Sequence, residues 1–190
     1  MPEADPASAQ RILDAALMEA EASGWYDLRL HAVAARAGVP LAAVLQHYRD
    51  ADAIADAWFA RALAAMLEGD PPDSGDPASA RMETVLMRWF AAHGAHRAVA
   101  GAMLRAKLHP SHPHHWVPMV FSLSRLIHWA LDAARLDARG LPRQAEEVGL
   151  TLLFLRTLPV WQHDNSAVLE RTRGFLRRNL GWLDRLPRRH

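Results

Sequence analysis

The chain has 190 residues, 51% of them hydrophobic and 23% charged, and a formal net charge of +1, which is typical of a globular protein with one large or two small domains. It contains no cysteine, which excludes disulfides, a thiolate nucleophile and cysteine-based zinc sites. No segment resembles a signal peptide or an apolar run of bilayer-spanning length, so we expect a cytoplasmic protein.

Abundant Ala, Leu and Arg, with few β-branched runs, favours an all-α fold of about nine helices. The first helix is predicted from Pro6 to Ser23. Asp5 is suited to cap it, Pro6 suits its first position, and Gly24 ends it. A second helix begins near His31.

The stretch from Val33 to Tyr48 is typical of two short helices joined by a glycine turn. Gly38 can take the positive φ that ends the first of them, and the second starts near Pro40. Leu41, Val44, Leu45 and Tyr48 then follow at helical spacing, and Tyr48 is expected to pack inward. This pattern predicts a helix-turn-helix.

A fourth, connecting helix is expected over residues 51–69, capped by Asp50. Residues 69–77 are rich in Gly, Pro, Asp and Ser, and they predict a loop between two domains. We therefore expect a helix-turn-helix domain over 1–50 and a second helical domain over 70–190. Five further helices are predicted in it, at 78–93 (capped by Asp76), 96–108, 116–136, from Pro142, and from about 166 to 186.

Charge is distributed unevenly along the chain. Residues 1–69 hold five arginines and ten acidic residues, a net charge of −5, whereas residues 165–190 carry seven arginines against Glu170 and Asp184. An acidic helix-turn-helix domain is repelled by a polyanion unless its cations cluster locally. Arg29, Arg36 and Arg49 could form such a cluster.

The chain resembles the TetR family of transcriptional regulators along its whole length. The resemblance rests mainly on Arg11 to Ala16, Gly24, Val33 to Val39, and His47-Tyr48 before Asp50. It implies an N-terminal domain that binds operator DNA, a second domain that encloses a small apolar molecule, and a homodimer formed by the last two helices. The candidate DNA-binding residues are then Arg29, Arg36, Pro40, Leu41, Ala42, Ala43, Gln46, His47 and Arg49.

The third helix departs from the family pattern, which usually places Ser or Thr, basic residues and a Gly-Thr pair where this chain has Pro40 to Leu45. Only Gln46, His47 and Tyr48 can hydrogen-bond there, although base readout needs donors and acceptors in the groove. The family resemblance favours DNA binding, and the charge and the apolar helix oppose it. Both interpretations stay open.

The alternative is a lipid-binding accessory protein that shares this fold without reading DNA, as in ubiquinone biosynthesis. Gly24-Trp25, Trp161 with Asp164 and Ser166, and Phe175-Leu176 are similar to that group. The C-terminal helix would then lie on an anionic membrane. The residues assigned to the membrane are Trp182, Leu183 and Leu186, which would insert, and Arg177, Arg178, Arg185, Arg188 and Arg189, which would reach the headgroups.

Large apolar residues of the second domain could line a ligand pocket or form plain core. The ligand-binding candidates are Trp89, Phe90, Met103, Trp116, Met119, Phe121, Trp129 and Phe154. The dimer candidates, implied by the resemblance, are Leu152, Leu155, Leu169, Phe175 and Leu176. In a regulator, the bound ligand would tilt the fourth helix and change the spacing of the two helix-turn-helix units.

The histidine-rich loop at His109, His112, His114 and His115 lacks the spacing of a helical metal site, so a solvated, pH-sensitive loop is expected. There is no Gly-x-Ser-x-Gly, phosphate-cradling glycine loop or His-Glu-x-x-His motif, and the Glu146-Glu147 pair is expected at an exposed helix start. The sequence therefore predicts no enzyme, no cofactor and no metal site.

Overall fold

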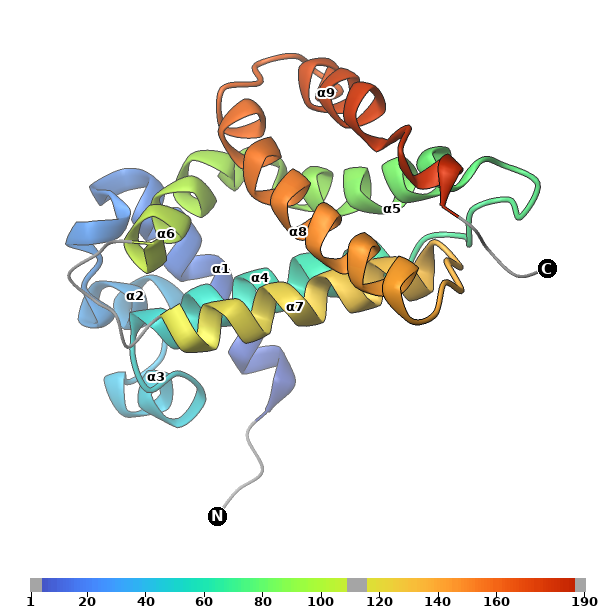
Figure 1. The fold of residues 1–190 in the computed structure, drawn as a ribbon. Helices are drawn as coiled ribbons and strands as arrows, with labels where there is room; N and C mark the ends of the chain where they lie inside the picture. The colour runs from blue at the N-terminus through green and yellow to red at the C-terminus, as the bar shows by residue number, and fades with distance from the viewer. Residues whose placement is uncertain (1–4, 109–115, 187–190) are drawn as a thin grey trace. The chain divides into compact units, whose positions relative to one another are not determined.

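The computed structural model describes residues 5–108 and 116–186. At residues 95, 108 and 116–121 it describes the backbone and not the side chains. Nine α-helices and three short 3-10 turns account for the regular structure of these residues, which contain no strand (Figure 1). The predicted all-α fold is confirmed. None of the helices in the described part of the chain is both long and apolar enough to cross a membrane.

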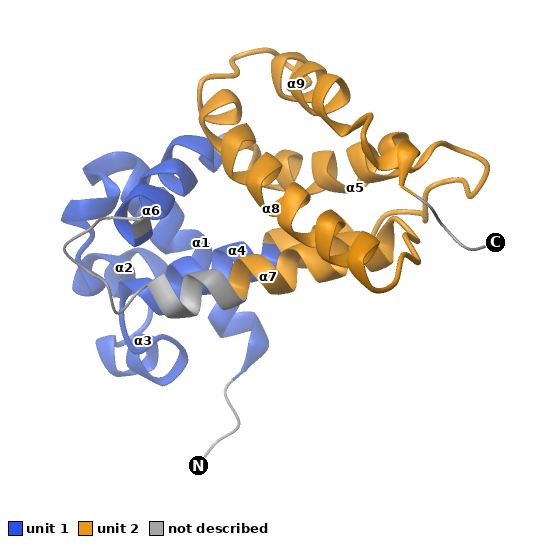
Figure 2. Ribbon diagram, in the orientation of Figure 1, with its two compact units in different colours: residues 1–61, 95–111 blue, residues 62–94, 112–190 orange. Residues whose placement is uncertain are grey.

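The chain forms two compact units (Figure 2). Unit 1 consists of residues 1–61 and 95–111, and unit 2 consists of residues 62–94 and 112–190. Unit 1 therefore contains a helix, α6 (Arg97–Leu108), that lies far along the sequence from the helix-turn-helix.

In unit 1, α1 (Pro6–Ser23) packs on α2 (Leu30–Ala37), and α2 packs on α3 (Leu41–His47). The carboxylate of Asp5 accepts from the N–H groups of Ala7 and Ser8 at 3.1 and 3.2 Å, which confirms the predicted cap. A 3-10 turn, η1 (Trp25–Asp27), follows α1, and α4 (Ala51–Leu67) begins in unit 1.

Unit 1 closes around a small set of apolar side chains. Those that are less than 2% exposed are Ile12, Ala16, Leu17, Val33, Val44, Ile54, Ala55, Ala100 and Met103. They come from α1, α2, α3, α4 and α6, so the helix-turn-helix is held by a common core rather than by local hydrogen bonds alone.

Unit 2 is built from α5 (Ala78–Ala92), α7 (Trp116–Ala133), α8 (Leu141–Gln162) and α9 (Glu170–Leu180). Helix α5 contacts α7 and α9, and α8 contacts α7 and α9. The fully buried residues of its core include Met82, Leu86, Phe90, Ile127, Leu131, Leu150, Trp161, Leu176, Leu180 and Leu183.

Three predicted helix ends and one predicted cap in unit 2 were wrong. Helix α7 ends at Ala133 because Arg135 takes a left-handed φ of 52°. Helix α9 begins at Glu170 and ends at Leu180, before the 3-10 turn Leu183–Arg185, and does not run from 166 to 186. The cap position of α5 is occupied by Pro77, which has an extended backbone and no side-chain group that can accept a hydrogen bond. The predicted cap, Asp76, lies one residue too early. Helix ends depend on local backbone angles that apolar spacing does not specify.

Glu146 is fully buried, contrary to the prediction that the Glu146-Glu147 pair lies at an exposed helix start. Glu147 lies at the surface, where its carboxylate accepts from Nε of Arg143 at 2.8 Å and pairs with Nε2 of His128 at 2.9 Å. Burial raises the pKa of Glu147, but the contacts with Arg143 and His128 outweigh that effect and lower it.

We expect Gly149→Ala to destabilise unit 2, because Gly149 of α8 is covered by the ring of Trp182. A Cβ at Gly149 would lie 2.7 Å from Cη2 and 2.8 Å from Cζ2 of that ring. The free energy of unfolding should fall by about 1–3 kcal/mol, as for other overpacked sites. Urea denaturation measures this change.

Gly181→Ala is the matched control for this substitution. A Cβ at Gly181 has no heavy atom within 4 Å, and the residue has a helical φ of −58°. We expect this variant to be neutral or more stable, because alanine restricts the unfolded chain. Equal effects of the two substitutions would contradict the packing of Trp182 on α8.

Candidate nucleic-acid interface

The turn between α2 and α3 is a Schellman motif centred on Gly38. Gly38 has φ 67° and ψ 34°, a left-handed conformation that favours glycine. Its N–H donates to the carbonyl of Ala35 at 3.2 Å, and the N–H of Val39 donates to that of Ala34 at 3.0 Å. These bonds satisfy the last carbonyls of α2, so the predicted glycine turn of the helix-turn-helix is confirmed.

Helix α3 begins one residue later than the sequence predicts. Pro40 has an extended ψ of 149° and stands before the helix as its cap residue, and Leu41 is the first helical residue. Pro40 has no side-chain hydrogen bond to offer the N–H groups of the first turn, so α3 lacks the usual polar cap.

The inward face of α3 is fixed by Val44 and Tyr48. Val44 is fully buried, and Tyr48, which is 8% exposed, donates its hydroxyl to the carbonyl of Ala9 on α1 at 3.0 Å. Burial raises the pKa of Tyr48, an effect that Arg61 opposes, so the hydroxyl stays a donor at neutral pH. The prediction that Tyr48 packs inward is confirmed.

The outward face of α3 is apolar except for one side chain. Leu41 and Leu45 are 52% and 67% exposed, and Ala42 and Gln46 beside them are also exposed. Leu45 was missing from the DNA-binding candidates, although it is more exposed than Leu41. Leu41, Val44, Leu45 and Tyr48 follow the i, i+3, i+4, i+7 spacing of one helix face, so spacing alone gave no signal that Leu41 and Leu45 are exposed.

A hollow of about 420 Å³ lies beside this face and is lined by Leu30, Leu41, Ala42, Val44, Leu45 and Tyr48. Every one of these side chains except the tyrosine is purely aliphatic. Of the remaining candidate DNA-binding residues on α3, Ala43 and His47 are half-buried.

The three candidate arginines are all exposed. Arg29 precedes α2, Arg36 pairs through Nη2 with Glu19 at 2.8 Å, and Arg49 pairs through Nε with Asp50 at 3.1 Å. Exposed pairs of this kind are worth at most about 1 kcal/mol, so both arginines can exchange their partners for phosphate at little cost.

Unit 1 is much less acidic than residues 1–69 suggest. Helix α6 brings Arg97, Arg105 and Lys107 into the unit, which then holds eight Lys and Arg against nine Asp and Glu, a net charge of −1. The net charge of −5 described a stretch of sequence and not the folded unit.

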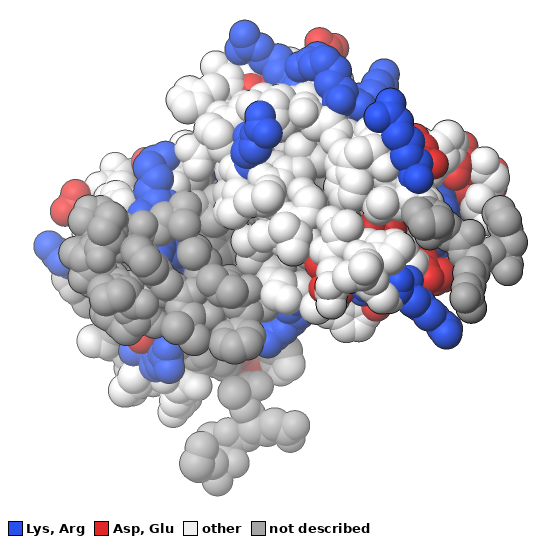
Figure 3. Space-filling view, in the orientation of Figure 1, with Lys and Arg blue, Asp and Glu red and all other residues white. Residues whose placement is uncertain are grey.

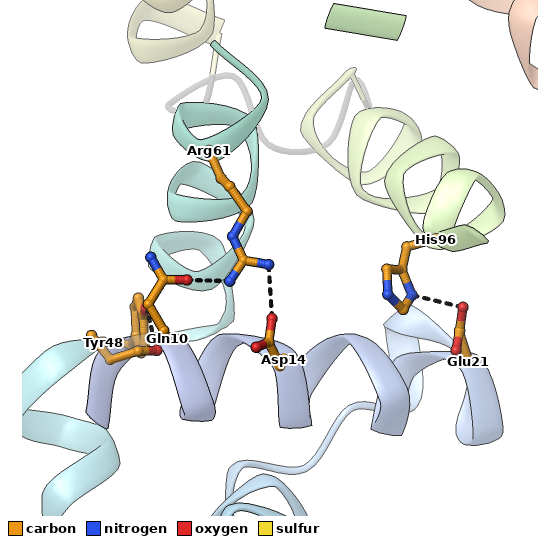
Figure 4. Close-up of polar contacts among 7 residues, drawn as sticks. Gln10, Asp14, Glu21, Tyr48, Arg61 and His96 are labelled. Carbon is orange, nitrogen blue, oxygen red and sulfur yellow. Dashed lines mark hydrogen bonds and ion pairs between the residues drawn. The ribbon is translucent and has the colours of Figure 1, made fainter. Parts of the chain in front are cut away.

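The acidic side chains of unit 1 are also largely paired. Arg61 donates from Nη1 to Asp14 at 2.7 Å and from Nη2 to Gln10, and Nδ1 of His96 lies 2.7 Å from Glu21 (Figure 4). Lys107 pairs with Asp56 at 2.9 Å. These contacts join α1 to α4 and to the start of α6, and they reduce the repulsion that the sequence predicts towards DNA.

The candidate ligand-binding residues only partly come together. Trp89, Phe90 and Phe154 form one buried cluster, in which the ring centroids of Trp89 and Phe154 lie 4.9 Å apart and those of Phe90 and Phe154 lie 5.3 Å apart. Trp129 is 48% exposed on α7, and Met103 is fully buried in unit 1. The side chains of Trp116, Met119 and Phe121 lie outside the described residues.

Trp161 and His93 complete this aromatic cluster. Trp161 is fully buried and donates its Nε1–H to the carbonyl of Phe90 at 3.2 Å. His93 packs between Trp89 and Trp161, with centroids 4.4 and 5.2 Å away. Burial lowers the pKa of His93 to about 3, so the cluster is uncharged at neutral pH.

The candidate dimer residues divide into outward and inward positions. Leu152 and Leu155 are 57% and 37% exposed on α8, in line with an exposed Val148, and Leu169 and Phe175 are half-buried. Leu176 is fully buried in the core of unit 2, which contradicts its assignment to a dimer interface.

The arginines of α9 gather along one edge of unit 2 (Figure 3). Two of them, Arg173 and Arg177, are exposed and both donate to the carboxylate of Glu83 on α5 at 3.3 Å. Leu183, assigned above to membrane insertion, is fully buried. The structure thus gives the membrane interpretation no support, and Arg188 and Arg189 lie outside the described residues.

No group of three His, Asp or Glu side chains in the described part of the chain is arranged to hold a metal ion. The histidines of the loop 109–115 lie outside that part, and their predicted role stays a prediction.

No family model and no curated protein matches the chain in sequence. Among solved structures, it is similar to a TetR transcriptional regulator from Nitrosomonas europaea ATCC 19718, with 34% identity over 96% of this chain and 100% of that chain and a TM-score of 0.81. A TetR transcriptional regulator from Rhodococcus sp. RHA1 is 21% identical over 95% and 97% of the two chains, with a TM-score of 0.64.

The multidrug binding protein EbrR, solved in complex with imidazole, is 23% identical over 98% of this chain and 93% of that chain, with a TM-score of 0.54. The last two likenesses show the fold, whereas the identity to the Nitrosomonas protein extends over nearly all of both chains. The chain therefore belongs to the TetR family of transcriptional regulators.

Proposed function

We propose that this protein is a homodimeric transcriptional regulator that binds operator DNA through unit 1 and a small apolar molecule through unit 2. The observation that carries the proposal is the identity of 34% over 96% of the chain to a TetR transcriptional regulator, together with an intact helix-turn-helix.

For DNA binding, α3 would enter the major groove while Arg29, Arg36 and Arg49 contact phosphates. All three arginines are exposed, and Asp14 and Asp56 of unit 1 are paired with Arg61 and Lys107, which are not among the proposed phosphate contacts. Two such units in a dimer would contact half-sites about 34 Å apart.

For ligand binding, the aromatic cluster of Trp89, Phe90, Phe154, Trp161 and His93 supports an apolar molecule. The cluster is buried, and the low pKa of His93 keeps it neutral, so a charged ligand would lose its hydration without a partner there. In the dimer, the two helix-turn-helix units would be spaced either to fit the operator or not to fit it. A ligand that binds one of these two states more tightly would shift the population towards that state, and α4 would connect the ligand site to the helix-turn-helix.

For dimerisation, α8 and α9 carry the supporting features. Val148, Leu152 and Leu155 are exposed at a spacing that puts them on one face of α8, and apolar side chains in such a row favour contact with a second copy. A groove of about 420 Å³ lies between α8 and α9, the two helices on which this interface would be built. It is lined by Val160, His163, Glu170, Arg171, Gly174, Phe175 and Arg178.

The test of DNA binding is fluorescence anisotropy with fragments of the upstream genomic DNA over a salt series. We expect saturable binding to one fragment. The logarithm of the binding constant should fall linearly with the logarithm of the salt concentration, with a slope of about −1 per phosphate contact. No binding to any fragment at low salt would refute the proposed function.

Arg49→Gln should weaken binding to that fragment and to unrelated DNA by about the same factor. It should also lower the salt slope by about one unit, as loss of one phosphate contact does. Arg139→Gln, which removes an exposed cation from unit 2, is the matched control and should leave both values unchanged. Equal losses in the two variants would mean that only the net charge matters.

A further inference from the structure

The outward face of α3 carries three aliphatic side chains and one amide. Leu41, Ala42, Leu45 and Gln46 are its exposed residues, and they occupy neighbouring positions on the same side of the helix. Two half-exposed leucines one turn apart are an unusual choice for a surface, because each exposes aliphatic area that would be more stable buried.

We propose that this leucine face, Leu41, Ala42 and Leu45, reads thymine C5-methyl groups in the major groove. The inference rests on the proposed function and names the part of the DNA that this protein recognises. Thymine is the only base that presents an apolar group there, and aliphatic side chains contact it without any hydrogen bond.

The hollow beside α3 has the lining that a methyl group requires. Its lining combines the buried or half-buried Leu30, Val44 and Tyr48 with the exposed Leu41, Ala42 and Leu45. A methyl group entering it would displace water from aliphatic surface on several sides, which is favourable in proportion to the area covered.

Gln46 adds the complementary contact on the same face. A glutamine amide can donate from Nε2 to N7 of adenine and accept at Oε1 from its N6 amino group, the bidentate pairing that proteins use to recognise this base. Adenine is the partner of thymine, so one exposed amide beside three aliphatic side chains selects a short run of A·T pairs. Each half-site therefore contains such a run at the position of α3.

The surroundings of the leucine face suit a nucleic acid better than a protein. Arg29, Arg36 and Arg49 are exposed in the same unit. The apolar area of two leucines and an alanine is far below the roughly 800 Å² per partner that a specific protein interface buries. DNA fits both the exposed arginines and the small apolar area. The arginines would contact phosphates and supply the affinity, and the leucine face would select the base sequence.

The experiment compares one operator duplex, found with the upstream fragments, in two forms. The second form has deoxyuridine in place of thymine, which removes only the methyl groups. We expect the wild-type protein to bind the deoxyuridine duplex about tenfold more weakly, because the aliphatic surface that the methyl groups cover, about as much as one leucine side chain buries, stays exposed to water. The salt slope should be the same for both duplexes, because the phosphate contacts do not change.

The double variant Leu41→Ala with Leu45→Ala should lose most of the tenfold difference between the two duplexes, because the two leucine side chains that contact the methyls are gone and only Ala42 of the leucine face is left unchanged. This comparison is a double-mutant cycle between protein and DNA, and it cancels any effect of deoxyuridine on the duplex itself. Met18→Ala is the control in the same unit: Met18 is 51% exposed on α1, and this variant should keep the full tenfold difference.

Equal binding of both duplexes by the wild type, with normal salt dependence, would overturn the methyl readout and leave the proposed function standing. No binding to either duplex at low salt would overturn both. A wild-type oligomer that the double variant loses, with unchanged discrimination between the duplexes, would assign the leucine face to a protein partner and overturn the proposal.

Discussion

Leu152→Asp combined with Leu155→Asp is expected to convert the protein to monomers and to weaken operator binding by about 100-fold or more, as loss of a linked second site does. Both side chains are exposed on α8, at 57% and 37%, so the change should leave unit 2 folded. In a dimer that buries this face, four carboxylates would lie in an apolar contact without partners, which is strongly unfavourable.

Sedimentation equilibrium measures the first effect and fluorescence anisotropy the second. Leu67→Asp is the matched control, because Leu67 at the end of α4 is 37% exposed, as Leu155 is. That variant should remain dimeric and should bind DNA normally. If the double variant sediments as the wild type does, the dimer interface lies elsewhere and the assignment of Leu152 and Leu155 fails.

Asp164→Asn is expected to lower the free energy of unfolding at pH 7 by about 2–3 kcal/mol, the value for lost charge-assisted hydrogen bonds at a helix cap. The carboxylate of Asp164 is fully buried and accepts four hydrogen bonds. One oxygen accepts from the N–H and hydroxyl of Ser166 at 3.1 and 2.5 Å, and the other from the N–H and hydroxyl of Thr172, both at 2.8 Å.

An asparagine at this position has the same shape but only one acceptor oxygen. Its NH₂ group must face either the N–H of Ser166 or the N–H of Thr172, and a backbone N–H cannot turn away as a hydroxyl can. Because these bonds tie α9 to the end of α8, the variant should also loosen the pair of helices on which we propose the dimer is built.

The effect of Asp164 should depend on pH with a defined sign. Burial would raise the pKa of its carboxyl group, but the hydrogen bonds from Ser166 and Thr172 outweigh burial and lower the pKa from 3.8 to about 2. The stabilisation is therefore fully present above about pH 4 and is lost as the pH falls towards 2, where the native carboxylate becomes protonated.

Urea denaturation at pH 7, 4 and 2.5 tests this prediction. The difference in stability between the wild type and Asp164→Asn should shrink over the last interval, whereas Asp137→Asn, at an exposed position, should have little effect at any pH. A difference that stays constant down to pH 2.5 would show that Asp164 acts through packing and not through its charge.

The helix-turn-helix was predictable because its signals are local. Gly38 must take a left-handed conformation, and Asp5 caps the helix that follows it, so a few adjacent residues decide each feature. The bounds of α1 were predicted correctly and those of α5 to within one residue, whereas α7 and α9 were predicted too long because apolar residues such as Leu136 and Leu183 continue beyond their ends.

The candidate site was harder, because it depends on which side of each helix is covered. Apolar spacing placed Leu45 with Val44, yet 67% of the Leu45 side chain is exposed. In the same way Leu176 was expected at an interface and lies in the core, and Glu146 was expected at the surface and is buried. A short helix with apolar residues on two sides does not reveal which side meets the core.

The sequence by itself determined the family, the all-α fold and the turn of the helix-turn-helix, since these follow from local backbone preferences and from periodicity. The tertiary structure alone decided the charge of the proposed DNA-binding unit and the chemistry of its outward face. Helix α6 adds three cations to unit 1, and the pairing of Arg61 with Asp14 and of His96 with Glu21 joins residues far apart in the chain. Electrostatic balance depends on distance in space, which a count along the sequence cannot supply.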